Sequence, residues 1–131
     1  VNGFEDALER GHQYIEAGCD VLFIEAPTSI EQMEVIGRTF GHQVPLVHNF
    51  AEGGGSPVEA AHELQYLGYK IALFPVALLH LFVQQAHQLL AHILEEGGTA
   101  AWHEKMTDLK GINQVLGTQE RLTKAQNYHR D

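Results

Sequence analysis

The sequence predicts an α/β protein in which three short parallel strands alternate with helices. Three short apolar runs, at residues 21–24, 44–49 and 69–75, are each followed by a segment with the apolar spacing of a helix. Strands separated by a single helix pair in parallel through right-handed crossovers. The 131 residues, 44% hydrophobic and 19% charged, suffice for one folded domain and exclude a disordered or fibrous chain.

The chain opens on a helical pattern between Asn2, a candidate N-cap, and Gly18, a candidate C-cap. Its apolar positions recur at helical spacing: Phe4, Ala7, Leu8, Gly11 and Ile15. The run from Val21 to Ile24 is short and rich in β-branched and aromatic residues, which favours a buried strand. Ser29 then begins the second helix, and residues 44–49 form the second strand.

A glycine-rich turn at residues 51–57 leads into the third helix, with Ser56 as its cap and Pro57 at its first position. The third strand, residues 69–75, precedes a long helix at residues 77–95. From Gly97 onward the chain has helical pieces but few apolar anchors, which predicts a helical tail.

Charge and composition exclude several functions. Lys and Arg number 8 against 17 Asp and Glu, a net charge of -9, which argues against nucleic acid or an anionic membrane as partner. Pro75 and His80 interrupt the longest apolar stretch, so no membrane span is expected. The single cysteine, Cys19, excludes an internal disulfide and is expected to be a small buried side chain in a reducing, cytoplasmic compartment. The start at Val1 rather than Met suggests truncation.

Polar side chains follow two of the predicted strands. Glu25 comes directly after the first, and Asn49 directly after the second, with Glu52 three residues on. The carboxyl ends of parallel strands meet at one rim, where such proteins build their sites. Polar residues after a strand also cap helices, and the turn at Gly53–Gly55 fits either a positive-φ turn or an anion site. The three polar residues together favour a site.

The nine histidines do not have metal-ligand spacing. His80 and His87 are seven apart, and His87 and His92 five apart, unlike the i, i+4 pair of a helical zinc site. We therefore expect no metal site formed by this chain. Five histidines are expected on solvated faces: His12, His62, His92, His103 and His129.

Several segments in order resemble the isocitrate lyase/phosphoenolpyruvate mutase superfamily. They cover residues 3–96, and the tail more loosely: Gly3-Phe4-Glu5-Asp6-Ala7-Leu8-Glu9-Arg10, Glu16-Ala17-Gly18-Cys19-Asp20, Leu22-Phe23-Ile24-Glu25-Ala26-Pro27, Pro45-Leu46-Val47-His48-Asn49, Leu73-Phe74-Pro75 and Met106-Thr107-Asp108-Leu109. The resemblance is to the branch with 2-methylisocitrate lyase, carboxyphosphonoenolpyruvate mutase and oxaloacetate decarboxylases.

The resemblance implies the last three strand–helix units of a (β/α)8 TIM barrel over residues 1–96, with a C-terminal helical tail at 97–131. It also implies Mg²⁺ as cofactor, with its aspartate ligands and the lyases' catalytic cysteine in the half that this chain does not match. Cys19 does not correspond to that cysteine.

The same resemblance implies roles for individual residues. Glu25 matches a catalytic glutamate at the substrate's carboxylate end, and Asn49 an asparagine that hydrogen-bonds the substrate. Glu52, Gly53 and His80 are further substrate-binding candidates, with His80 where lyases commonly have arginine. Gly53 in place of phenylalanine, Ala51 in place of threonine and Leu109 in place of a late arginine contact favour a smaller 2-oxo acid or phosphonate over a tricarboxylate.

The leading interpretation is therefore the C-terminal part of a Mg²⁺-dependent lyase or mutase that breaks or forms a C–C or P–C bond through an enolate-like intermediate. Alone, the chain is expected to be inactive. The resemblance also implies a homo-oligomer, tetrameric in longer relatives, built through the helix at 77–95. Two alternatives stay open: a non-catalytic half-barrel that binds a small anion, and a part of an unrelated barrel enzyme.

Overall fold

The computed structural model describes residues 2–128. Val1, at the start of the region predicted at 1–96, and residues 129–131, at the end of the tail predicted at 97–131, lie outside the described residues. His129, expected on a solvated face, is among them. The chain divides into two compact units, Val1–Leu81 and Phe82–Asp131. The long helix α4 (Ala77–Glu96) belongs to both, and each unit is described by itself.

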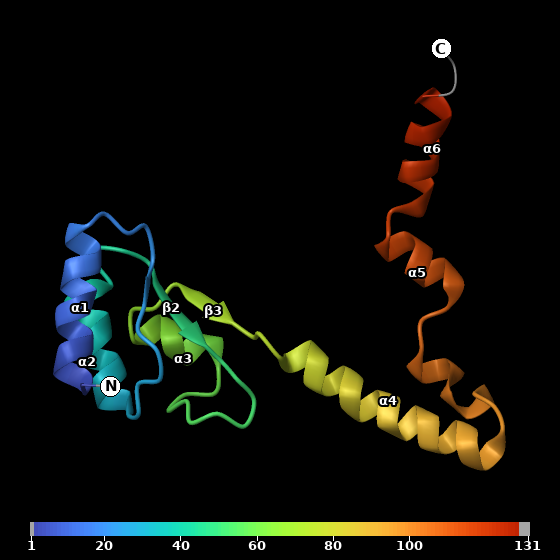
Figure 1. Ribbon diagram of the computed structural model, residues 1–131, viewed down its shortest axis with the longest axis horizontal. Coiled ribbons are helices and arrows are strands. Elements are labelled where there is room, and N and C mark those ends of the chain that lie inside the picture. Colours follow the sequence, from blue (N-terminus) through green and yellow to red (C-terminus); the bar gives the residue numbers. More distant parts are fainter. Residues whose placement is uncertain (1, 129–131) are drawn as a thin grey trace. The chain divides into compact units, whose positions relative to one another are not determined.

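The first unit has an α/β fold with a parallel sheet, as the sequence predicts (Figure 1). Its elements alternate along the chain: α1 (Phe4–Glu16), β1 (Leu22–Phe23), α2 (Ile30–Phe40), β2 (Leu46–Asn49), α3 (Ala61–Tyr66) and β3 (Ile71–Leu73). The strand order is β1-β2-β3, and both strand pairs are parallel. Within the described residues β1 and β3 are therefore edge strands.

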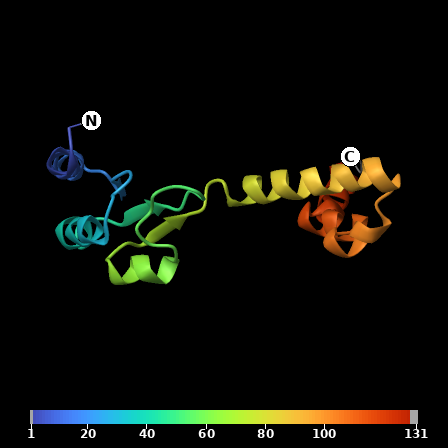
Figure 2. The same ribbon diagram turned by 90° about the horizontal axis from the view of Figure 1, so that it is seen from below.

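The core lies between the sheet and the helices α2 and α3, which cover the same sheet face (Figure 2). Four large side chains there are almost fully buried: Met33, Ile36, Phe40 and Leu46. Helix α1 packs against α2 where Gly11 meets the ring of Phe40. Burial of these side chains, each worth about 1.5–3 kcal/mol, is what orders this face of the sheet.

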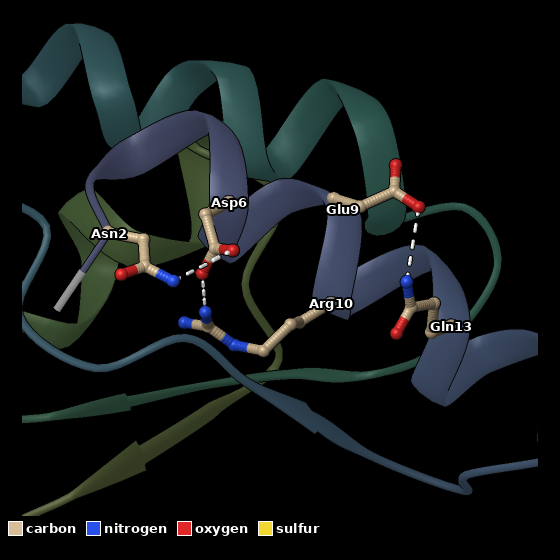
Figure 3. Close-up of polar contacts among 5 residues, drawn as sticks. All are labelled: Asn2, Asp6, Glu9, Arg10 and Gln13. Atoms are coloured by element: carbon tan, nitrogen blue, oxygen red, sulfur yellow. Dashed lines mark hydrogen bonds and ion pairs between the residues drawn. The ribbon is translucent and has the colours of Figure 1, made fainter.

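Short-range polar pairs lie along α1 (Figure 3). Arg10 pairs with Asp6, and the Gln13 side chain donates to Glu9 Oε1 over 3.2 Å. Asn2 is not the N-cap: that position is Gly3, and the Asn2 amide instead donates to Asp6 Oδ1 over 3.4 Å. Exposed pairs of this kind contribute about 0–1 kcal/mol each, so apolar packing holds α1 in place.

Helix starts confirm one sequence prediction and correct another. Ser29 caps α2, since its hydroxyl accepts the backbone N–H of Gln32. The third helix begins at Ala61 rather than at Pro57, with the Glu63 carboxylate accepting the backbone N–H groups of Glu59 and Ala60. Ser56 does not cap α3, because its side chain bonds instead to a residue of β2, as described below.

One sheet face carries the core, and the other is open. The register pairs Phe23 with Val47 and Val47 with Ile71, so these three share the open face. Leu46 pairs with Leu22 and lies in the core, because successive strand residues alternate in direction. Cys19 is half-buried rather than buried.

The second unit contains the rest of α4, a 3₁₀ helix η1 (Ala100–Lys105), α5 (Leu109–Val115) and α6 (Thr118–Tyr128). Among residues 82–128, Trp102 is the one buried large side chain, and Lys105 Nζ lies 4.4 Å from its ring centroid. Among residues 2–128, none of the helices is both long enough and apolar enough to cross a bilayer.

We expect the 131-residue chain to self-associate. No residue of α4 is buried, although the helix carries large apolar side chains. Leu78, Phe82 and Leu94, for example, are 82%, 68% and 88% exposed. Phe23 and Leu73 on the open sheet face are exposed as well, and exposed apolar surface and unpaired strand edges favour association. Size-exclusion chromatography with light scattering at micromolar concentration should show oligomers or aggregates. A single 14.6 kDa species with a cooperative melt would contradict this and support an independent half-barrel.

Candidate functional site

A hollow of about 300 Å³ lies at the carboxyl ends of β1 and β2, and we call it the rim hollow. It is lined by the end of β1, the β1–α2 loop, the end of β2 and the glycine-rich turn. Its residues are Phe23, Glu25, Ala26, Pro27, Thr28, His48, Asn49, Ala51, Gly54, Gly55 and Ser56. The predicted strand-end residues Glu25 and Asn49 thus face one space.

Glu25 is placed by an unusual backbone. The next residue, Ala26, has φ 53°, a left-handed conformation that costs a non-glycine residue about 1–2 kcal/mol. Pro27 follows and is buried, which fixes the chain where it leaves the strand. The loop therefore holds the exposed Glu25 carboxylate at the wall of the hollow rather than along the strand.

Asn49 has an unsatisfied polar atom. Its Oδ1 is buried and has no hydrogen-bond partner within residues 2–128. A buried acceptor left unpaired costs about 1–3 kcal/mol. A bound molecule or water that donates a hydrogen to this oxygen would remove that cost.

His48 is the buried polar side chain behind the hollow, 4% exposed. Its Nε2 lies 2.8 Å from Ser56 Oγ, and its ring stands nearly perpendicular to the rings of Phe50 and Tyr69, at centroid distances of 5.1 Å and 5.9 Å. Burial lowers the pKa of His48 below its usual range, partly opposed by the nearby carboxylate of Glu25. Burial likewise raises the pKa of Tyr69 to about 12, so both side chains are neutral near pH 7.

Three other predicted residues lie apart from the rim hollow. Glu52 and Gly53 line an adjacent hollow of about 310 Å³, together with Phe50 and Phe74. His80 is exposed on the first turn of α4 and lines neither hollow. The structure therefore brings Glu25 and Asn49 together and leaves Glu52, Gly53 and His80 outside their space.

The residues at the rim do not make up a Mg²⁺ site. The oxygen donors that line it include one carboxylate, Glu25, and the orphaned amide oxygen of Asn49. Residues 2–128 contain no cluster of three or more His, Cys, Asp or Glu side chains able to hold a metal. Mg²⁺ prefers six oxygen ligands in octahedral geometry, so this donor set by itself is incomplete.

Sequence reasoning missed the roles of His48 and Ser56. His48 lies within an apolar strand and Ser56 precedes a proline, a pattern that favoured a helix cap. A buried histidine among apolar neighbours was the available signal, because a buried polar group needs a partner. The identity of that partner, eight residues away, depends on the path of the turn.

The fold and the rim hollow define an α/β protein with a parallel sheet, whose polar groups gather at the carboxyl ends of the strands. The chain is 37% identical over 97 residues to 2-methylisocitrate lyase of Aeropyrum pernix, covering 74% of this chain and 31% of that protein. It is 32% identical over 129 residues to 2,3-dimethylmalate lyase of Eubacterium barkeri, covering 98% and 44%. It is 32% identical over 116 residues to the chloroplastic carboxyvinyl-carboxyphosphonate phosphorylmutase of Arabidopsis thaliana, covering 88% and 33%. The chain belongs to the isocitrate lyase/phosphoenolpyruvate mutase superfamily.

Solved structures agree. The crystal structure of 2,3-dimethylmalate lyase matches with a TM-score of 0.82 at 28% identity, covering 98% of this chain and 44% of that one. Phosphonopyruvate hydrolase, solved with oxalate and Mg++, shares the fold with a TM-score of 0.76 at 21% identity, over 98% and 45%. No protein-family model matches the chain. The chain spans less than half the length of these relatives. Because the chain belongs to this superfamily, the alternative that it is part of an unrelated barrel enzyme is wrong.

Proposed function

We propose that this chain forms the substrate-carboxylate side of an active site that breaks or forms a C–C or P–C bond in a 2-oxo acid or related carboxylate. The observation that carries the proposal is the shared placement of Glu25 and Asn49 at the rim hollow, with the Asn49 amide oxygen buried and unpaired within residues 2–128. The superfamily relatives named above, lyases and a mutase of small carboxylates or phosphonates, support the same reaction class.

The two side chains take complementary parts in this reaction. When the bond to the substrate carbon breaks, its electron pair moves toward the 2-oxo group and negative charge grows on that oxygen. The Asn49 amide N–H donates to the carboxylate or to this oxygen, which stabilises the enolate-like state. Glu25 accepts a hydrogen from a substrate hydroxyl or a bound water and so orients the reacting end.

The lining of the rim hollow points to a small substrate. None of its residues is Lys or Arg, so these residues offer no cation to pair with a second or third carboxylate. The residues of the turn that line this hollow are Ala51, Gly54, Gly55 and Ser56, and none of them has a bulky or charged side chain. A small 2-oxo acid or a phosphonate fits this lining better than a tricarboxylate, and Glu52, Gly53 and His80 remain candidates for its outer contacts.

The remaining features of the proposal rest on the superfamily. We assign residues 1–96 to the last three strand–helix units of a barrel and residues 97–131 to a helical tail. Mg²⁺ is the proposed cofactor, supported by its presence in the structure of phosphonopyruvate hydrolase, and its ligands would lie outside residues 2–128. We also propose a cytoplasmic homo-oligomer assembled through the helix at 77–95.

We expect the 131-residue chain alone to show no turnover, because its rim lacks a metal-binding carboxylate pair. The chain and the complete reading frame that contains it would be assayed with Mg²⁺ against 2-methylisocitrate, oxaloacetate and phosphonopyruvate. The complete protein should form a 2-oxo acid or another cleavage product from one of them. Turnover by the chain alone above about 1 s⁻¹, an ordinary enzymatic rate, would contradict the first expectation. An inactive complete protein that binds the same anions would favour the binding module.

A further inference from the structure

We infer that His48 is a positioning residue that holds the glycine-rich turn, residues 51–57, beside the rim hollow through its hydrogen bond to Ser56. The inference rests on the proposed function, because the position of the turn affects a reaction only if the hollow binds the substrate. It concerns a contact between the middle of the sheet and the loop that lines the candidate site.

The hydrogen bonds around Ser56 fix which atom donates. The Ser56 hydroxyl donates to the carbonyl oxygen of Val58 over 2.7 Å, so its hydrogen is already used. The Nε2 of His48, 2.8 Å from Ser56 Oγ, must then carry the hydrogen and donate. His48 is therefore the Nε2–H tautomer, and any replacement must keep a donor at this place.

The turn is tied to the sheet at both ends. At its start the backbone N–H of Phe50 donates to the carbonyl oxygen of Leu73 over 2.8 Å. Within it the N–H of Gly54 donates to the carbonyl oxygen of Ala51, also over 2.8 Å. At its far end the side chain of Ser56 makes the contact to β2. The first tie involves backbone alone, whereas the last depends on two side chains.

The turn needs this second tie because of its composition. Residues 51–55 include three consecutive glycines and are all exposed, so little apolar burial restrains them. Glycine loses more conformational freedom on ordering than any other residue. His48 is buried, which protects its hydrogen bond from competition by water and makes the bond an effective restraint.

The charge state of His48 supports the same role. The titratable groups that face it are Glu25, at the end of β1, and Tyr69, which precedes β3. Because burial depresses the pKa of His48 in the fold, the folded chain binds the proton less readily than the unfolded chain does. The contribution of neutral, buried His48 to the free energy of unfolding is therefore fully present above the usual histidine pKa, near 6.5. This contribution declines as the pH falls below that value.

Amide hydrogen exchange at Gly54 in the 131-residue chain tests the inference without an activity assay. We expect His48→Leu and Ser56→Ala to speed exchange at Gly54 about tenfold, because the far end of the turn is released. His48→Gln and Ser56→Thr keep a donor and a hydroxyl, and exchange should stay within about threefold of the unmodified chain. Exchange at Phe50, whose bond to Leu73 is separate, should not change. Mass spectrometry with fragmentation measures these amides in oligomers too.

Ile36→Val is the matched control, because it trims a core side chain that is 1% exposed and belongs to α2 rather than to the turn. If it speeds exchange at Gly54 as much as Ser56→Ala does, the effect is general destabilisation and the inference is wrong. Unchanged exchange in both His48→Leu and Ser56→Ala would also overturn it.

The complete protein separates this inference from the proposed function. There His48→Leu should lower kcat/KM about tenfold, and His48→Gln should restore it to within about threefold. An active complete protein that His48→Leu leaves unchanged would overturn the positioning role and leave the proposed function standing. A complete protein without lyase or mutase activity would remove the proposed function, and with it the positioning role in a reaction, whatever the exchange result.

Discussion

Replacing Gly37 with alanine is expected to destabilise the first unit by about 3 kcal/mol, a large part of the roughly 5–15 kcal/mol by which folded chains are ordinarily stable. An added Cβ at this buried position on α2 would overlap the carbonyl oxygen of Leu67 and approach the carbonyl carbon to 3.0 Å. Both neighbours are backbone atoms, so no side-chain rotation can relieve the overlap. Helix α2 would have to move away from the turn that ends α3, which would open the core around Met33 and Leu64.

Thermal and urea unfolding followed by circular dichroism would measure this effect. Gly98→Ala is the matched control, because its Cβ would meet no atom within 4 Å, and it should change stability by no more than about 0.5 kcal/mol. Equal unfolding midpoints for Gly37→Ala and Gly98→Ala would show that α2 and the turn after α3 are not in close contact.

In the complete protein, Glu25→Gln and Asn49→Ala should each lower kcat about a hundredfold or more, and lower kcat at least as much as they raise KM. Both side chains face the rim hollow, and we place both at the enolate-like state rather than at the bound substrate alone. Interactions that strengthen in the transition state appear in kcat, whereas equal binding of both states appears in KM.

Steady-state kinetics on the purified variants, with Mg²⁺ and the accepted substrate, would measure these constants. Glu16→Gln and Asn127→Ala serve as controls, since both residues are exposed on helices and line neither the rim hollow nor the adjacent one. Unchanged kcat in both site variants would reduce Glu25 and Asn49 to residues that shape the ends of their strands.

Much of the site could be predicted because it follows directly from strand polarity. Once three strands are joined by single helices, they run in parallel, and residues that follow them lie at one rim. That reasoning placed Glu25 and Asn49 together without knowledge of any distance. It placed Glu52 there as well, but the glycine-rich turn carries Glu52 to the adjacent hollow, since a turn rich in glycine can take many paths.

Local sequence therefore determined the elements, the parallel sheet, the Ser29 cap and the two residues at the rim, because each depends on neighbours along the chain or on strand direction alone. Tertiary structure decided what depends on register and on approach between distant segments. Leu46 faces the core because Phe23 pairs with Val47 and not with Leu46. Gly37 is required because the backbone at Leu67 lies against it, and Ser56 bonds His48 rather than capping a helix because the turn folds back onto β2. Such contacts join residues whose separation in space is set by the packed core, which no local pattern encodes.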